Sequence, residues 1–257
     1  MKKELGVVML LSVVLLSGCG SDKPETYTQG SGESSFIQVT TQPEQGSDLN
    51  EKLIQSSDDD KVRLFAINEK DNEVQGTTLE LNGKTKDFDW TFPAVEGYKP
   101  QVYFDDVTDD GTEEAVITVF KNRSPGVYLE EIHVVKSDDL SEINIEDPLE
   151  IIAEAVETIV QNNKGALTVT VKIGDKQHEL VHEGDPDFEY KNELNFGGVV
   201  DYNVVSNKIV AKVDGSVGIG EYVCSLTVYY KYDSATKMFT AGKIEFSLIN
   251  EKKIAKP

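Results

Sequence analysis

Hydrophobic and polar residues alternate along much of the chain after residue 60, a pattern that is typical of half-buried β-strands. The alternation is clearest in 78–81 and 88–92, on either side of Asn82-Gly83. Because both residues of an Asn-Gly pair accept a positive φ, the pair predicts a hairpin turn between antiparallel strands. Further strands are predicted at 62–67, 101–104, 115–120, 129–135, 167–173, 179–182, 199–205, 209–213, 222–232 and 243–248.

One segment has the spacing of a helix instead. Its apolar residues recur three or four positions apart, which places them on one helical face. They are Leu149, Ile152, Val156, Ile159 and Val160. Asp147 can cap this helix, Pro148 suits its first position, and Glu150 completes a capping box. With a stop signal at 162–165, the pattern predicts an amphipathic helix over about 148–163 that covers a sheet.

Runs of strands with one interposed helix predict an α+β fold with a mostly antiparallel sheet, because the pattern contains no alternating βαβ units. We expect a β-rich subdomain over 61–147 and a subdomain of helix and antiparallel sheet over 148–250. Two arrangements fit this division, one core that both subdomains share or one core in each. About 190 residues are enough to build a sizeable core in either case.

The start of the chain has the features of an export signal. Lys2 and Lys3 precede an apolar run over 5–16, and small residues follow before Cys19. A basic start, a short apolar core and small residues at a cleavage site are typical of a secretory signal peptide. The run is too short for a transmembrane helix, which needs about 20 apolar residues.

Leu16-Ser17-Gly18-Cys19 resembles the lipobox of bacterial lipoproteins. The resemblance implies that residues 1–18 are removed and that Cys19 receives a diacylglyceryl lipid on its sulfur. Two acyl chains give a stable anchor, whereas a single chain holds only weakly. The resemblance therefore implies a protein that is lipid-anchored on the extracytoplasmic face of the cell membrane.

Residues 19–60 contain mostly Ser, Gly, Gln, Thr and acidic residues, with few large apolar ones. Such a composition buries too little apolar surface to offset the entropy of ordering the chain. We expect a flexible acidic tether that holds the folded part away from the membrane.

The chain is strongly acidic, with 25 Lys and Arg against 46 Asp and Glu and a net charge of -21. Removal of 1–18 takes away two Lys and one Glu, which leaves 23 against 45 and a net charge of -22. This balance argues against nucleic-acid binding and against adsorption to anionic lipid head groups. It suits a soluble body, and it also favours the attraction of cations.

The most specific motif lies between two predicted strands, at 106–114. Oxygen-bearing side chains occupy alternate positions, and Gly111 allows a sharp turn that aims them inward. Compact loops of this kind suit calcium, which takes six to eight oxygen ligands. The predicted metal ligands are Asp106, Thr108, Asp110, Thr112 through its carbonyl, and Glu114.

The arrangement of strand, D-x-T-x-D-G-x-x-E and strand resembles the calcium loops of FG-GAP or VCBS repeats. The resemblance covers roughly 101–120 and implies a structural calcium ion in a propeller-like blade. Two departures from the family are Thr108, where Asn or Asp is usual, and the single copy of the loop. The alternative is an acidic β-turn that binds no ion, since Asp and Gly are common turn residues.

Three other features have simple structural interpretations. The glycine-rich run 215–220 predicts a loop between strands, because no helix follows it to form a phosphate site. His178 and His182 flank a strand and lie about 13 Å apart on one face, too far for one zinc ion. Cys224 alternates with Leu226, which predicts a buried hydrophobe rather than a nucleophile.

Together these features predict a lipid-anchored extracytoplasmic binding or envelope-associated module with a structural calcium loop, and not an enzyme. Its expected partners are the membrane, through the lipid on Cys19, and an envelope protein or polymer. The alternative is a hydrolase of envelope polymers that uses two carboxylates about 5 to 9.5 Å apart. No catalytic residue is predicted, because acidic pairs are abundant and none stands out.

Overall fold

The computed structural model describes residues 52–164, 166–185, 187–188 and 190–249. The expected signal segment 1–18, the lipidation site Cys19 and most of the expected tether 19–60 lie outside these residues. The last part of the tether range is described, and it is not a tether. Strand β1 (Lys52–Ser56) pairs antiparallel with β2 (Val62–Lys70), so strand structure begins before residue 61.

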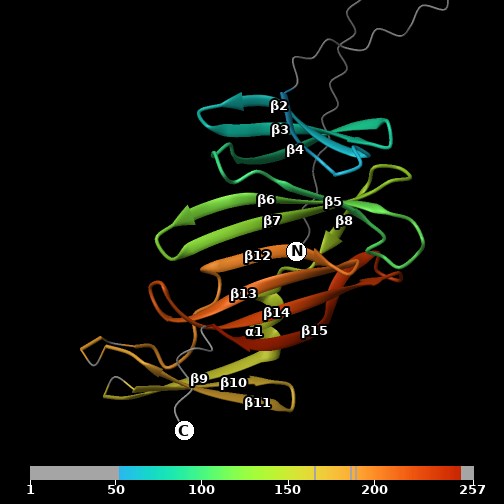
Figure 1. The fold of residues 1–257 in the computed structure, drawn as a ribbon. Helices are drawn as coiled ribbons and strands as arrows, with labels where there is room; N and C mark the ends of the chain where they lie inside the picture. Colours follow the sequence, from blue (N-terminus) through green and yellow to red (C-terminus); the bar gives the residue numbers. More distant parts are fainter. Residues whose placement is uncertain (1–51, 165, 186, 189, 250–257) are drawn as a thin grey trace, which may run out of the picture. The chain divides into compact units, whose positions relative to one another are not determined.

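The predicted α+β fold is wrong. Strands make up 67% of the described residues and helix only 4%, and the fold is like a β-sandwich with one short helix. Figure 1 shows the strands grouped into sheets, with one short helix among them. The difference lies mainly in the segment that was predicted to be a long amphipathic helix.

Helix α1 (Pro148–Ala155) begins as the sequence predicts. The carboxylate of Asp147 accepts a hydrogen bond from the amide of Leu149 at 2.7 Å, and Pro148 occupies the first turn. The helix ends after eight residues, because the chain continues as strand β9 (Val156–Asn163).

Two physical reasons explain why the predicted helix stops at Ala155. Valine, isoleucine and threonine are frequent just after it, and their branched Cβ atoms favour extended backbone. Thr158 and Val160 also alternate with exposed residues, so the segment fits a strand period as well as a helical one. Strand β9 pairs along its whole length with β10 (Ala166–Ile173), and these backbone hydrogen bonds decide between the two periods.

A four-stranded antiparallel sheet has the order β1-β2-β3-β4. Its hairpin between β3 (Glu73–Leu81) and β4 (Lys84–Pro93) confirms the predicted turn. Asn82 and Gly83 have φ values of 51° and 79°, the positive values that a two-residue hairpin requires.

An eight-stranded sheet has the order β12-β13-β14-β15-β8-β7-β6-β5. Its strands are β5 (Gln101–Asp105), β6 (Glu114–Ser124), β7 (Val127–Lys136), β8 (Glu142–Ile145), β12 (Val199–Val205), β13 (Lys208–Gly218), β14 (Glu221–Asp233) and β15 (Met238–Leu248). Strand β12 also pairs with β7, so the sheet folds back and closes a ring of paired strands. Both predicted subdomains contribute strands to this one sheet.

A three-stranded sheet of β11 (Lys176–Glu183), β10 and β9 completes the strand structure of the described residues. Its buried residues Leu167, Val169 and Val171 belong to the same hydrophobic cluster as the inner residues of β13 and β14. The three-stranded sheet therefore covers part of the core of the closed ring.

Two hydrophobic clusters lie on opposite faces of β6 and β7. Val116 and Val134 belong to the larger cluster, which extends into the ring and the three-stranded sheet. Their neighbours Ala115 and Val135 belong to a second cluster with the four-stranded sheet. The described residues therefore form two cores, one on each face of β6 and β7. The boundary between the cores is this pair of strands and not residue 147, where the predicted subdomains meet.

Two short parallel pairings hold the ring together, and we call them the parallel seams. At the seam between β7 and β12, Glu130 accepts a hydrogen bond from the amide of Tyr202 at 2.8 Å. At the seam between β8 and β15, Glu146 accepts one from the amide of Ala241 at 2.9 Å. In each seam a glutamate follows the last paired residue, and its carboxylate extends the pairing by one hydrogen bond.

Replacement of Glu130 by alanine tests the seam between β7 and β12. Glu130→Ala leaves the buried amide of Tyr202 without its acceptor, so we expect the free energy of unfolding to fall by about 1–3 kcal/mol. Urea denaturation measures this change. Glu131→Ala is the matched control, since the neighbouring Glu131 makes only a surface ion pair with Lys121 and should cost about 0–1 kcal/mol. Equal losses in both variants would contradict the role of the seam.

Candidate functional site

The acidic loop between β5 and β6 is closed by hydrogen bonds to its own aspartates. The carboxylate of Asp106 accepts from the amides of Asp110 at 3.2 Å and Gly111 at 3.0 Å. Asp110 in turn accepts from the amide of Thr112 at 2.8 Å. Gly111 has a φ of 88°, which is the sharp turn that the sequence predicts at this position.

Glu114 begins β6 at the base of this loop, and only 2% of it is exposed. Its carboxylate accepts hydrogen bonds from the amide of Val107 at 3.2 Å and the hydroxyl of Thr108 at 3.4 Å. Burial first, and then the nearby negative charges of Asp110 and Asp106, raise the pKa of Glu114 to about 7. Two of the predicted calcium ligands, Asp106 and Asp110, therefore lie close enough to Glu114 to disfavour its charged form.

The arrangement of the loop does not by itself form a coordination shell. Among the residues that the structure describes, no three His, Cys, Asp or Glu side chains are placed to hold a metal ion. Asp106 is turned toward backbone amides, and Glu114 is turned toward Val107 and Thr108. Calcium binding by this loop stays a prediction, and it requires these carboxylates to turn toward a common ion.

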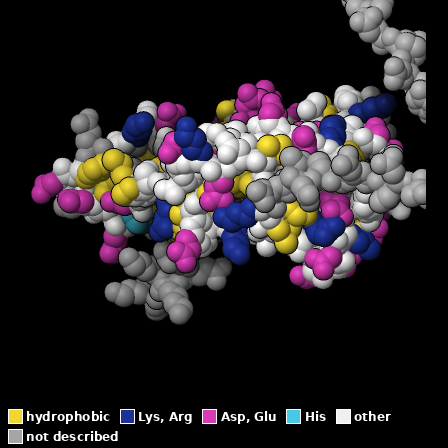
Figure 2. Space-filling model, turned by 90° about the horizontal axis from the view of Figure 1, so that it is seen from above, with side chains coloured by type: hydrophobic (Ala, Val, Ile, Leu, Met, Phe, Trp, Pro, Cys, Tyr) yellow, Lys and Arg dark blue, Asp and Glu magenta, His cyan; other side chains and the backbone are white. Residues whose placement is uncertain are grey.

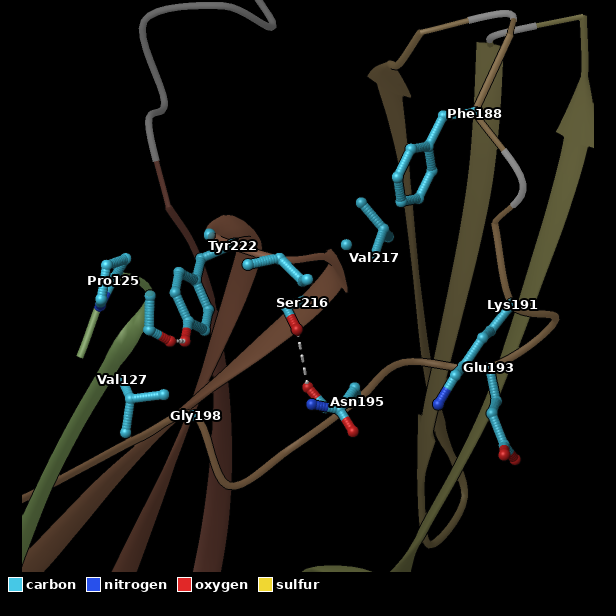
Figure 3. Close-up of a pocket in the computed structure, with 14 residues that line it drawn as sticks. Pro125, Val127, Phe188, Lys191, Glu193, Asn195, Gly198, Ser216, Val217 and Tyr222 are labelled. Atoms are coloured by element: carbon cyan, nitrogen blue, oxygen red, sulfur yellow. Dashed lines mark hydrogen bonds between the residues drawn. The ribbon is translucent and has the colours of Figure 1, made fainter. Parts of the chain in front are cut away.

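A second candidate site is a cavity of about 330 Å³ between three connections of the chain, which we call the hairpin-tip cavity (Figure 3). One wall comes from the turn between β6 and β7, one from the turn between β13 and β14, and one from the connection between β11 and β12. The lining residues are Pro125, Gly126, Val127, Phe188, Lys191, Glu193, Asn195, Gly198, Ser216, Val217, Gly218, Ile219, Gly220 and Tyr222.

Glycines let the three walls approach closely. A Cβ on Gly126 would lie 3.0 Å from the backbone nitrogen of Gly220, and a Cβ on Gly198 would overlap the hydroxyl of Tyr222. Glycine is therefore needed where the turn between β6 and β7 meets its neighbours. The glycine-rich run 215–220 was the signal in the sequence for one wall of this cavity, but it was interpreted only as a loop between strands. Strand β13 in fact continues to Gly218, and the turn is at Ile219-Gly220.

Polar groups in the cavity walls bind one another. The hydroxyl of Tyr222 donates to the carbonyl of Gly126, and the hydroxyl of Ser216 donates to the carbonyl of Asn195 at 3.2 Å. The backbones of Asn195 and Ser216 also exchange two hydrogen bonds of 2.9 Å. The surface that these walls leave for a ligand is consequently mostly apolar.

Apolar side chains at the mouth of the cavity are exposed. Ile219, at the tip of the hairpin between β13 and β14, is 90% exposed, and Phe188 is 44% exposed. Elsewhere the surface carries many charges, and Figure 2 shows acidic side chains spread over the visible face with hydrophobic side chains in separate patches. An isoleucine this exposed has no packing role in the described fold, so it is a candidate contact residue.

Cys224 lies where the alternation predicts, on the inner face of β14. It is completely buried in the same cluster as Leu226 and Val228. Burial raises the pKa of its thiol to about 12, and the negative charge of Asp214 adds to this effect. The thiol therefore stays protonated at neutral pH, and its position confirms the predicted buried hydrophobe.

The two histidines that the sequence places on one face of a strand have separate partners. The ring of His178 stacks on Phe246 with a centroid distance of 4.4 Å. Nε2 of His182 lies 3.7 Å from the carboxylate of Glu221. The structure therefore does not bring these histidines to a common ligand.

One carboxyl pair lies at the seam between β7 and β12. Burial raises the pKa of Glu130, and Asp201 beside it contributes to the same shift. The oxygens of Glu130 are used by the hydroxyl of Tyr128 and the amide of Tyr202. The pair does not line the hairpin-tip cavity, and its contacts serve strand pairing.

Comparison of the chain with protein families, curated proteins and solved structures finds no match. Within the described residues, no helix has the length and hydrophobicity needed to cross a bilayer. The likenesses to the lipobox and to FG-GAP or VCBS loops accordingly rest on their motifs in this sequence.

The buried carboxyl of Glu114 gives a pH prediction. Its folded pKa of about 7 lies above the ordinary 4.5, so its contribution to stability is greatest below about pH 4.5 and is lost as the pH rises through 7. Without calcium, we expect the unsubstituted chain to lose about 1–3 kcal/mol more than Glu114→Gln between pH 5 and pH 8. Urea denaturation at both values measures the difference, and parallel pH dependences would contradict it.

Proposed function

We propose that this chain is a lipid-anchored binding module on the extracytoplasmic face of the cell membrane, with an envelope protein or polymer as its partner. The lipobox-like residues at 16–19 and the polar segment that follows support the anchor. The single observation that carries the binding role is the hairpin-tip cavity, because the hydroxyls of Tyr222 and Ser216 in its walls are already paired while Ile219 and Phe188 at its mouth are exposed.

A scaffold of this kind suits binding. Strands β7, β12, β13 and β14 beside the cavity are paired on both sides in the closed ring, while the three connections that form the walls lie at strand ends. Binding residues are commonly placed on loops that a rigid framework positions.

Fractionation of cells tests the anchor. We expect the unsubstituted protein in the membrane fraction with its amino terminus at a lipid-modified Cys19, and Cys19→Ser in the soluble or unprocessed pool. Mass spectrometry of the intact protein measures the added diacylglyceryl mass. Cys224→Ser is a control for the substitution, because that thiol is buried and far from the amino terminus in sequence. Recovery of an unmodified, uncleaved native chain from the cytosol would contradict the anchor.

We also propose that the acidic loop 106–114 binds a structural calcium ion. The support is the spacing of Asp106, Asp110 and Glu114, the turn at Gly111 and the repulsion of the Glu114 carboxylate by Asp110 and Asp106. A divalent cation relieves such repulsion, and calcium accepts carboxylate, hydroxyl and carbonyl oxygens. Lys208 forms an ion pair with Asp109, so the loop is also held against the turn between β12 and β13.

Calcium titration tests this site. If the dissociation constant is about 0.5 mM, 5 mM calcium should stabilise the unsubstituted chain by about 1.4 kcal/mol. Asp110→Ala should remove this gain, as measured by thermal or urea unfolding with calcium and with chelator.

Asp139→Ala is the matched control for the calcium experiment. Like Asp110, Asp139 accepts a hydrogen bond of 2.8 Å from the amide two residues ahead, at Ser141, but it lies outside the loop. Loss of a local turn bond is thus common to both variants, and only Asp110→Ala should lose the response to calcium. No gain in the unsubstituted chain at millimolar calcium would reject the site.

A further inference from the structure

We propose that the hairpin-tip cavity binds one acyl chain of a membrane phospholipid. The proposal deepens the proposed function, because it names the class of ligand for the same cavity. The claim that the bilayer supplies this acyl chain rests on the proposed anchor. The claim that the cavity can bind an acyl chain does not rest on it.

The paired polar groups of the walls decide the polarity of the ligand. Tyr222 and Ser216 donate their hydroxyl hydrogens to backbone carbonyls within the walls, so neither is offered to a ligand as a free donor. Most of the remaining wall surface is apolar and includes Val127 and Val217, while the polar side chains of Lys191, Glu193 and Asn195 all come from the connection between β11 and β12. A ligand rich in hydroxyl or amide groups would find side-chain partners only along that connection, whereas a hydrocarbon chain has no such groups to satisfy.

The size of the cavity limits the ligand to one chain. About 330 Å³ lies at the lower end of the range of roughly 300–1,000 Å³ found for ligand pockets. The ring of Phe188 lies against the turn, since its Cε1 is 3.5 Å from the position of a Cβ on Gly218. Phe188 therefore narrows the cavity on the side of the connection between β11 and β12.

The mouth of the cavity has both apolar and charged side chains, as expected for a site that holds the part of a lipid next to its head group. Ile219 projects from the hairpin tip into solvent, where it can follow a chain into the interfacial layer of a bilayer. Lys191 and Glu193 lie on the wall opposite Pro125 and Tyr222 (Figure 3), so the rim carries both charges. A zwitterionic head group complements both, and it avoids the repulsion that an anionic lipid would meet from so acidic a chain.

The binding test uses alkyl phosphocholines of increasing chain length below their micelle concentrations. They are added to the full chain carrying Cys19→Ser, and backbone amide NMR shifts report the site that is filled. We expect saturable shifts at Gly218 and Gly220 but not at Val181, which is exposed on β11. Affinity should rise about fourfold for each added methylene until the cavity is filled and should then level off.

Three substitutions distinguish this site from general detergent binding. Ile219→Ser should weaken binding about tenfold, and Asn195→Trp should block the cavity, because the Asn195 side chain lines it while its backbone makes the hydrogen bonds to Ser216. Val181→Ser is the matched control, since Val181 is 60% exposed, and it should leave affinity unchanged.

The outcomes separate the cavity from the anchor. Absence of saturable shifts at the hairpin tips, or equal weakening by Val181→Ser, would overturn the proposal even if Cys19 is lipidated in cells. Saturable binding that Ile219→Ser and Asn195→Trp both reduce supports it, even if fractionation rejects the anchor. Flotation with phosphatidylcholine vesicles then tests the source of the chain, and vesicle binding that Ile219→Ser does not weaken would reject the bilayer as that source.

Discussion

Closure of the eight-stranded sheet depends on two short parallel seams, and the rest of the described structure is arranged around them. Each seam has only two paired positions on each strand, and in each a glutamate carboxylate accepts the next amide. A carboxylate is costly to place beside packed strands, but an amide without an acceptor there is also costly. The hydrogen bonds of Glu130 and Glu146 offset both costs. Each amide gains an acceptor, and each carboxylate gains a backbone donor that partly replaces the water it loses.

Strand β6 links the two candidate sites. It begins at Glu114, at the base of the acidic loop, and ends at Ser124, next to the first residue of the hairpin-tip cavity. Between these ends, residues 115–119 are buried from both sides by the two hydrophobic clusters. Eleven residues of antiparallel strand span about 35 Å, so the acidic loop and the cavity lie at opposite ends of one strand.

Local signals in the sequence predicted most of the elements. The Asn82-Gly83 turn, the cap at Asp147 and the inward face of Cys224 each depend on a few neighbouring residues, and the structure confirms all three. The helix over 148–163 was wrong in its second half because the apolar positions there fit both periods. This segment forms a strand because it pairs with β10, and the spacing of its own residues carries no information about that pairing.

The hairpin-tip cavity was beyond prediction for a related reason. Its walls come from 125–127, from Phe188 and 191–198, and from 216–222, and no local pattern says that these segments meet. They meet because β12 returns to pair with β7, and a parallel pairing of two positions leaves no periodic trace in the sequence. The acidic loop was easier to locate, since all of its residues are consecutive, but the sequence does not say that Asp106 and Glu114 turn toward groups of the loop itself.

Burial of β6 on both faces also affects how the molecule opens. Its central amides are hydrogen-bonded to β5 or β7 and shielded by side chains above and below, so they can exchange with deuterium only when both cores separate. The slowest-exchanging amides of the described chain should accordingly lie between the acidic loop and the cavity. Both sites would then stay connected through every partial opening short of global unfolding.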